Sequence, residues 1–264
     1  MRDFLASDRS PLEPPADQAD GLRRLFGHGR TRFVAVAANA EVAFSALALE
    51  RLAAACAGPG QRVLVVDAAP GSPAPHEMAA LDLAAGVEVL TPQLSVLAAR
   101  GLPLRHVDAR GSCAGFLQAV ADAAPQCQVV IVHAEAAELG RLFARREACP
   151  LLLAADHPSS VTSAYANLKL LAQRHGLMAF DLLLVAAAHS PRTPRIVEQL
   201  RRTADQFVGA VLRHWAVIDP GAAAGEPHAA LDRLAQAQLE RTPGAIETSA
   251  TLRRTPTPLG VGAP

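Results

Sequence analysis

Lysine is nearly absent from this sequence, because Lys169 is the single lysine among 25 basic residues in a chain of 264. A mechanism that needs a lysine at any other position is therefore excluded. Aromatic residues are also scarce, at 4%, although half of the residues are apolar, so the core must consist mainly of Ala, Val and Leu, as in sheets covered by helices. No basic excess exists either, since 25 acidic residues balance the basic ones, which argues against a protein that binds nucleic acid.

Long hydrophobic runs are missing as well. The longest, such as residues 63–66 and 151–155, are the size of strands and fall far below the roughly 20 residues that span a bilayer. The N-terminal residues MRDFLASDRSPLEPP carry charges and prolines where a secretory signal has its apolar region, so we expect a cytoplasmic protein. The four cysteines are too scattered for a metal site and are expected to be reduced thiols in the core or on the surface.

The segment before the first strand is predicted to contain a flexible arm, residues 1–15, and a short helix, residues 16–27. Prolines break regular structure in the arm, and Asp17 is a suitable N-cap for the helix. Apolar residues then recur on one side at helical spacing, namely Leu22, Leu25 and Phe26. A helix of about ten residues is marginal alone in water, so its apolar side needs a surface to contact.

From residue 31 to 241 the sequence alternates between short apolar runs and longer helical patterns. Strands are predicted at 33–38, 62–68, 102–107, 127–133, 150–155, 180–186 and 211–218. Helices are predicted up to Ala57 and at about 112–124, 136–147, 159–175 and 194–207. Strands that are apolar on both faces and separated by helices indicate a mainly parallel sheet. The expected fold class is α/β, a doubly wound and mainly parallel sheet sandwiched by helices.

The C-terminal part is predicted to hold one more helix, at 228–241, followed by a disordered tail, residues 242–264, which lacks periodicity. Leu231, Leu234 and Leu239 fall on one side of this helix. Docking of that side onto the domain is favoured over binding to a membrane surface, because the polar side is not markedly basic.

The loop after the first strand is where an open parallel sheet would bind phosphate, at the carboxyl ends of its strands. Here the loop reads ANAEVAFSA, residues 38–46, and contains neither glycine nor lysine. A phosphate site needs backbone N–H groups left uncovered by small residues, usually glycines, and a lysine for the terminal phosphates. Glu41 would add a negative charge beside any bound phosphate. We therefore expect no nucleotide and no metal cofactor.

Other polar residues near strand ends give weaker signals. Asp67 is a candidate for positioning magnesium or water, although a solvated carboxylate or a helix cap is its more common role. His133 is more often satisfied by backbone than catalytic, and Asp156-His157-Pro158 is typical of a loop that caps a helix. Four arginines are expected on a solvated helix face, namely Arg192, Arg195, Arg201 and Arg202. No residue is predicted to be catalytic within this chain.

Three segments together resemble one protein family. They are DQADGLR at 17–23, HPSSVTSAYANLKLL at 157–171, and the run from Phe180 to Pro220. The first matches an N-terminal DQAxxLR motif at every fixed position, just ahead of the first strand. Over about residues 16–240 the chain thus resembles the MinD-like ATPases, specifically the flagellar number regulators called FlhG or FleN. The resemblance implies a MinD-type P-loop NTPase fold.

The phosphate-binding KGGVGKT loop of that family aligns with residues 40–46, where every essential position differs. The two lysine positions hold Ala40 and Ser45, the glycine positions hold Glu41, Val42 and Phe44, and the magnesium-binding threonine is Ala46. The family's DxD becomes Asp67-Ala68-Ala69, its magnesium-site aspartate falls on His133, and its asparagine near the base falls among residues 186–188. The resemblance therefore implies a degenerate member in which nucleotide binding and hydrolysis are lost.

In the family, the DQAxxLR helix docks on the signal-recognition-type GTPase FlhF and stimulates its hydrolysis at the flagellated pole. The resemblance thus implies a GTPase activator that is not itself an enzyme. The residues expected to contact the partner are Asp17, Gln18, Ala19, Leu22, Arg23 and Phe26. Gln18 is a neutral amide that both donates and accepts, so it is the candidate for orienting attacking water in the partner's site. Leu22 offers apolar area to a groove, and Arg23 offers a partner for a carboxylate or phosphate.

The resemblance also implies flagellar switch proteins or a flagellar transcription activator as further partners, and recruitment to the cell pole. Membrane contact is expected to be weak or absent, because in the family ATP favours the membrane-bound state of the C-terminal helix. Two alternatives stay open. One is an ATPase with a site rebuilt around Glu41, Asp67 and His133, which the loop composition disfavours. The other is a scaffold for another polar or envelope machine, which the flagellar DQAxxLR motif disfavours.

Overall fold

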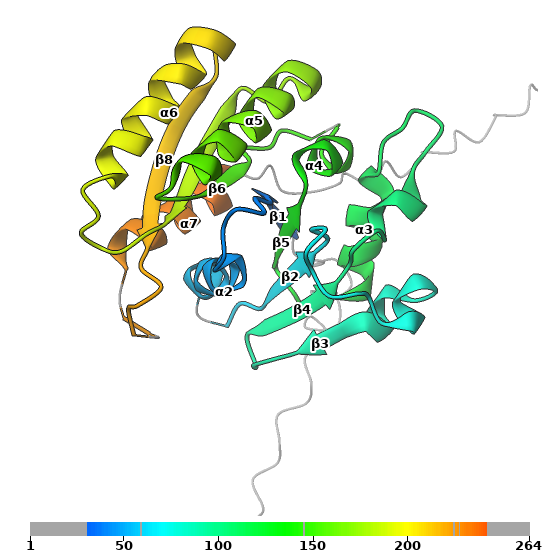
Figure 1. Cartoon of the computed structure of the whole chain (residues 1–264). Coiled ribbons are helices and arrows are strands. Elements are labelled where there is room, and N and C mark those ends of the chain that lie inside the picture. The colour runs from blue at the N-terminus through cyan, green and yellow to red at the C-terminus, as the bar shows by residue number, and fades with distance from the viewer. Residues whose placement is uncertain (1–30, 59, 145, 224, 227, 242–264) are drawn as a thin grey trace, which may run out of the picture.

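A single eight-stranded sheet forms the centre of the molecule, with helices on both faces (Figure 1). The computed structural model describes residues 31–241 except positions 59, 145, 224 and 227, so the predicted arm, N-terminal helix and tail lie outside the described residues. The strand order is β3-β4-β2-β5-β1-β6-β7-β8, and all neighbouring pairs are parallel except β3 with β4. The predicted fold class, a mainly parallel sheet sandwiched by helices, is confirmed.

The strands are short, and the central ones are buried along their length because helices cover both faces. Their bounds are β1 (Arg32–Ala37), β2 (Val63–Asp67), β3 (Val87–Val89), β4 (Leu94–Ala98), β5 (Val129–Ala134), β6 (Leu151–Ala155), β7 (Ala179–Val185) and β8 (Val211–Ile218). The side chains alternate between two apolar clusters. In β1, for example, Val34 and Val36 enter one cluster while Phe33 and Ala35 enter the other.

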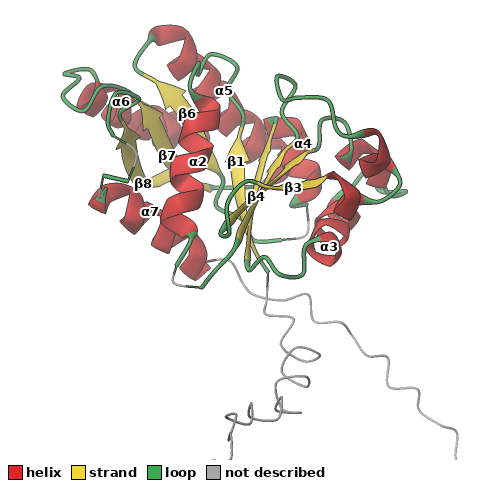
Figure 2. Ribbon diagram, turned by 90° about the horizontal axis from the view of Figure 1, so that it is seen from below, coloured by secondary structure: helices red, strands yellow, loops and turns green. Residues whose placement is uncertain are grey.

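The helices divide between the two faces (Figures 1 and 2). The α-helices are α2 (Ser45–Cys56), α3 (Ala114–Ala123), α4 (Ala136–Leu142), α5 (Pro158–His175), α6 (Thr193–Val208) and α7 (Ala229–Arg241). Short 3-10 helices are η1 (Glu77–Ala80), η2 (Leu83–Gly86) and η3 (Pro103–His106). Helices α2 and α7 pack on one face of the sheet, and α3, α4, α5 and α6 pack on the other.

The region between β2 and β5 differs from the prediction. The strand predicted at 102–107 is wrong, because this stretch forms η3, with Pro103 in its first turn. Proline suits that position, since its missing N–H and fixed φ are compatible with the start of a helical turn. The strands β3 and β4 arise earlier in the chain and were not predicted. Helix α4 ends before the predicted residue 147, and the chain then turns so that the Arg146 guanidinium lies 4.9 Å from the centre of the Phe33 ring.

The last described helix, α7, docks on the domain as predicted. Leu231 and Leu234 are buried in the apolar cluster that α2 and β8 also enter. The Gln238 amide strengthens this docking by donating to the Asp181 carboxylate at 2.8 Å and to the Cys149 carbonyl at 3.0 Å. Among the residues that the structure describes, no helix combines the length and the apolar character needed to cross a membrane.

All four cysteines are thiols outside any disulfide, which confirms their predicted role as small core or surface residues. Cys56, Cys113 and Cys127 are buried, and Cys149 is half-buried. Burial raises the pKa of the Cys56 thiol to about 12, because the thiolate would lose its hydration.

Candidate functional site

The loop between β1 and α2 lies at the carboxyl edge of the sheet and is closed by its own hydrogen bonds. Asn39, only 5% exposed, accepts from the Glu41 N–H through its side-chain oxygen at 3.1 Å. The Asn39 carbonyl accepts from the Val42 N–H at 3.0 Å. These two backbone N–H groups are therefore already satisfied within the loop.

An apolar side chain fills the inner side of this loop. Val42 is 4% exposed and belongs to the cluster beneath α2. The other loop residues that align with the family's phosphate site face outward: Phe44 is 53% exposed, Ala40, Glu41 and Ala46 are exposed, and Ser45 is half-buried. The structure therefore places Ala40, Glu41, Val42 and Phe44 on the loop and Ser45 and Ala46 in the first turn of α2, with Val42 holding the loop against the core.

Hydrogen bonds to the β6–α5 region fasten the loop from the other side. The Asn39 amide nitrogen donates to the Leu153 carbonyl at 2.8 Å and to the Ser160 carbonyl at 2.9 Å. Asn167 of α5 donates to the Ala38 carbonyl at 2.8 Å. The loop is thus bound to one strand and one helix that lie far away in the sequence.

His157, at the N-terminus of α5, completes this fastening. Its Nε2 lies 2.9 Å from the Glu41 carbonyl, which can only accept, so Nε2 carries the proton. Its Nδ1 then accepts from the Ser160 N–H at 3.4 Å, which caps α5 as predicted for this segment. One imidazole therefore caps a helix and holds the β1–α2 loop.

The single lysine does not serve this loop. Lys169 is exposed on α5, two residues after Asn167, and residues two apart do not share a helix face. The N-terminus of α2 has no side-chain cap and no acidic residue in its first turn, so its partial positive charge stays at the carboxyl edge. That charge is about half an elementary charge, which is small beside a triphosphate.

The expectation that backbone satisfies His133 is wrong. Asp67 of β2 and His133 of β5 are register partners, so their side chains meet on the same face of the sheet, and Nδ1 lies 2.8 Å from Asp67 Oδ1. His133 is 4% exposed, and its Nε2 is buried without a hydrogen-bond partner among the described residues. Glu41 is exposed and bonded elsewhere through its backbone, so the structure pairs two of the three residues of the alternative ATPase site.

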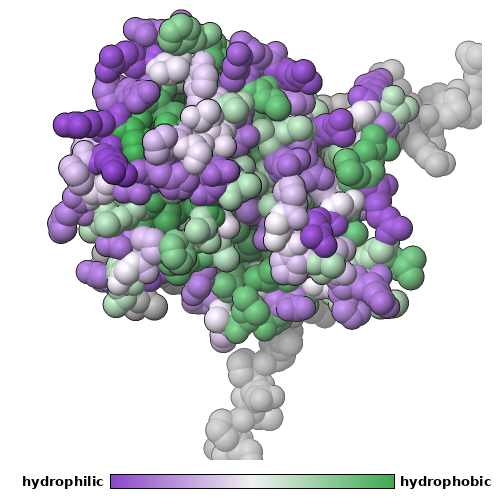
Figure 3. Space-filling view, viewed as in Figure 1, coloured by the Kyte–Doolittle hydropathy of each residue, from purple (hydrophilic) through white to green (hydrophobic). Residues whose placement is uncertain are grey.

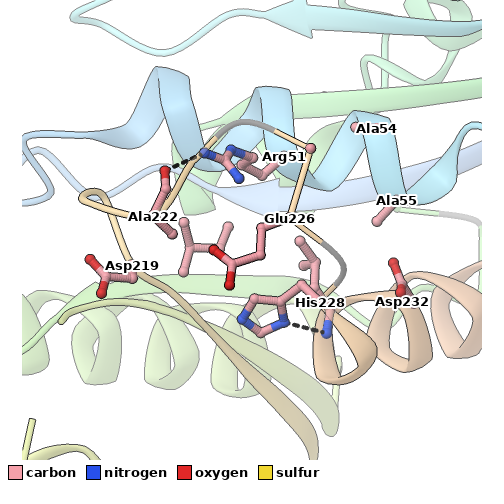
Figure 4. A pocket seen from close by; sticks show the side chains of 11 residues that line it. Arg51, Ala54, Ala55, Asp219, Ala222, Glu226, His228 and Asp232 are labelled. Carbon is pink, nitrogen blue, oxygen red and sulfur yellow. Dashed lines mark hydrogen bonds between the residues drawn. The ribbon is translucent and has the colours of Figure 1, made fainter. Parts of the chain in front are cut away.

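A hollow of about 250 Å³ lies between α2, the end of β8 and the start of α7 (Figure 4). Arg51 spans it by donating to the Ala222 and Ala223 carbonyls, each at 3.0 Å. At its edge, Asp219 accepts from the N–H groups of Ala188 at 2.9 Å and Gly221 at 2.8 Å, and these bonds hold the pKa of Asp219 below its usual value. The Asp219 carboxylate after β8 therefore ties this loop to the backbone of the loop after β7, where the family has an asparagine.

The other residues singled out by the sequence are either exposed or outside the described residues. The arginines expected on a solvated face, Arg192, Arg195, Arg201 and Arg202, are exposed, as predicted. The predicted partner-binding residues Asp17, Gln18, Ala19, Leu22, Arg23 and Phe26 lie outside the described residues. Sequence reasoning missed Asn39, His157 and Asn167 as fasteners of the loop. Their only signal is a polar residue directly after an apolar strand or inside a helix.

Comparison with known proteins adds a sequence relative. No protein-family model matches the chain. Over 120 residues it is 34% identical to the antiactivator FleN of Pseudomonas aeruginosa, in a match that covers 44% of this chain and 40% of that protein. The chain thus spans less than half the length of the curated relative that it matches.

Solved structures share the fold at low identity. A ParA family ATPase from Chlorobium tepidum has a TM-score of 0.50 at 16% identity, over 81% of this chain and 96% of that chain. A chain of the MinC:MinD cell division complex of Aquifex aeolicus has 0.51 at 11% identity, over 72% and 82%. A cobyrinic acid a,c-diamide synthase from Mycobacterium smegmatis with an ATP analogue and magnesium has 0.54 at 15% identity, over 82% and 100%. Over 120 residues the chain is therefore similar to FleN in sequence, and it has the fold that ParA- and MinD-family ATPases share.

Proposed function

We propose that this chain is a flagellar number and placement regulator that neither binds nor hydrolyses ATP, and that it stimulates an FlhF-type GTPase through residues 16–27. The similarity to the antiactivator FleN supports the regulatory role. The DQAxxLR match at residues 17–23 supports the choice of partner. Recruitment to the pole, and contact with switch proteins or a transcription activator, belong to the same proposal.

The closed β1–α2 loop is the observation that carries the loss of nucleotide binding. A phosphate cradle would require the loop to release Val42 from the core and to give up the bonds made by Asn39 and His157. Burial of a valine contributes roughly 1.5–3 kcal/mol, and each hydrogen bond about 1 kcal/mol net. Opening the loop therefore costs about as much as ATP binding at 100 μM affinity returns, roughly 5 kcal/mol.

The proposed activity leaves the chemistry in the partner. Gln18 would orient the attacking water in the GTPase site without adding charge, as glutamines do in other GTPases. Leu22 and Phe26 would supply apolar contact area, and Arg23 a charge-assisted contact. Nothing in this role requires the closed β1–α2 loop to change.

The test is GTP turnover by purified FlhF with and without the full chain. We expect stimulation by the wild-type chain and its loss in Gln18→Ala. The matched control is Gln199→Ala, which removes an exposed amide on α6 and should leave stimulation intact. Equal turnover with and without the wild-type chain would refute the proposal.

The alternative ATPase has one observation in its favour, the buried pair of Asp67 and His133. Calorimetric titration of the full chain with ATP and magnesium decides between the two functions. We expect no binding tighter than about 100 μM, equivalent to roughly 5 kcal/mol. Tighter binding that disappears in Asp67→Asn would establish a rebuilt site and end the proposal of a nucleotide-free regulator.

A further inference from the structure

A hollow of about 440 Å³ with apolar and polar walls lies between η1, η2, η3 and α3, on the face of the sheet opposite α2. Its floor and walls are rich in small side chains, among them Ala79, Ala84, Ala119 and Ala123. Leu81 stands at its wall with 84% of its surface exposed. In Figure 3 apolar side chains appear on the right of the view, where this part of the chain lies. The combination of alanines and exposed apolar walls suits a helix laid into a groove.

Charged residues flank this groove. Asp82 and Asp122 are exposed carboxylates on opposite sides, and Arg105 reaches across to donate to the Ala80 carbonyl at 3.3 Å. The predicted N-terminal helix carries Leu22, Leu25 and Phe26 on one side, and the adjacent Arg23 and Arg24 are suited to meet the two carboxylates. The apolar walls and the two carboxylates, which outnumber the single Arg105 guanidinium, therefore favour this segment as the occupant.

The start of the domain lies within reach of the groove. The Arg32 N–H donates to the Gln128 carbonyl at 2.9 Å, and only five residue steps separate Gln128 from Ala123 at the groove. Five steps span at most about 18 Å, and the six steps from Phe26 to Arg32 span at most about 22 Å. The segment is thus long enough to return to the groove of its own chain.

We propose that residues 17–26 dock in this groove of their own chain with the apolar side inward. Docking would cover Leu22 and Phe26, the same side chains that the proposed function assigns to the GTPase. The two contacts exclude each other, so the groove withholds the activating segment until a partner competes for it. The docking itself rests on the groove, and only this regulatory consequence rests on the proposed function.

Disulfide trapping in the full chain tests the docking. Leu25→Cys is combined with Leu81→Cys, with Cys149→Ser removing the half-buried native thiol. A disulfide forms only when the two Cα atoms come within about 4.4–6.8 Å. The control pairs Leu25→Cys with Phe207→Cys, an exposed position on α6. Because docking holds residue 25 beside residue 81 and not beside residue 207, we expect intramolecular disulfide at least about tenfold faster in the groove pair than in the control.

A second variant blocks the groove without touching the core. Ala84→Arg adds bulk and positive charge to an exposed lining position, and Ala54→Arg does the same at an exposed position on α2. Docking that is favourable by about 1.4 kcal/mol leaves roughly one segment in ten undocked. In FlhF turnover assays we therefore expect the Ala84→Arg variant to stimulate about tenfold more strongly than the Ala54→Arg variant. Formation of the disulfide should abolish stimulation, and its reduction should restore it.

The outcomes separate the two proposals. Trapping without stimulation by any variant would leave the docking standing and refute the function. Stimulation with equal trapping in the groove and control pairs would refute the docking. Disulfide-linked dimers would assign the segment to a second copy, and weaker stimulation by Ala84→Arg without trapping would assign the groove to the GTPase. Either of these last two results overturns the docking.

Discussion

Replacing Val42 by glycine tests whether the β1–α2 loop is a packed part of the core. In a phosphate-binding loop glycine at this position is favourable, whereas here Val42 is almost completely buried beneath α2. Loss of a buried valine costs roughly 1.5–3 kcal/mol, and the added backbone freedom of glycine costs about 0.5–1 kcal/mol. Val42→Gly should therefore lower the free energy of unfolding by about 2–4 kcal/mol.

The matched control is Ala43→Gly, because Ala43 is exposed and adjacent in the same loop. It adds backbone freedom without removing buried area, so its cost should stay near about 0.5–1 kcal/mol. Urea unfolding measures both variants, with a falling midpoint and an unchanged m-value. Equal costs for the two variants would mean that Val42 does not hold the loop, and the argument for a closed site would fail.

Three further predictions concern groups around the same edge and the core. Asn39→Ala should cost about 2–3 kcal/mol and Asn167→Ala about 1 kcal/mol in urea unfolding, because Asn39 leaves several buried partners unpaired. Asp219, whose pKa is lowered by two N–H donors, stabilises the fold above its unfolded pKa of about 3.9 and loses that contribution as the pH falls through its folded pKa. The difference in Tm between wild type and Asp219→Asn should accordingly close in acid; a difference that widens there contradicts the sign. In native protein at pH 8 a thiol reagent should modify Cys149 alone, since Cys56, Cys113 and Cys127 are buried, and fast reaction of a second thiol counts against this.

The sheet could be predicted wherever its strands are buried on both faces. Runs such as 63–66 and 151–155 are apolar throughout, because helices cover them on both sides. Strands β3 and β4, at one edge of the sheet, were harder to predict. In β4 buried and half-buried residues alternate, and its position is fixed by pairing with β2, where Val65 meets Val96, which a local pattern does not reveal. The apolar run at 102–107 became η3 because its proline starts a helical turn.

Some features of the candidate site could likewise be predicted from local sequence, and others depend on residues far apart in the chain. The missing glycines and lysine are visible in the loop itself, and they predicted the change of chemistry there. The bonds that close the loop are not visible, because they join residues 114 to 129 positions apart. The pair of Asp67 and His133 likewise depends on the register of β2 against β5. Sequence reasoning therefore found what the loop lacks, and only the structure shows what replaced it.

The hydrogen bonds that close the β1–α2 loop affect how such a protein can be regulated. A ligand that binds only the folded state stabilises it by mass action, so a nucleotide-binding protein of this fold changes its stability with nucleotide concentration. Here intramolecular bonds from Asn39, His157 and Asn167 hold the corresponding loop, and on the proposed function they persist at every nucleotide concentration. On the proposed function the carboxyl edge of the sheet is then constant, and regulation has to act elsewhere. A tethered segment that exchanges between its own groove and a partner supplies that second route, and it responds to the concentration of the partner instead of ATP.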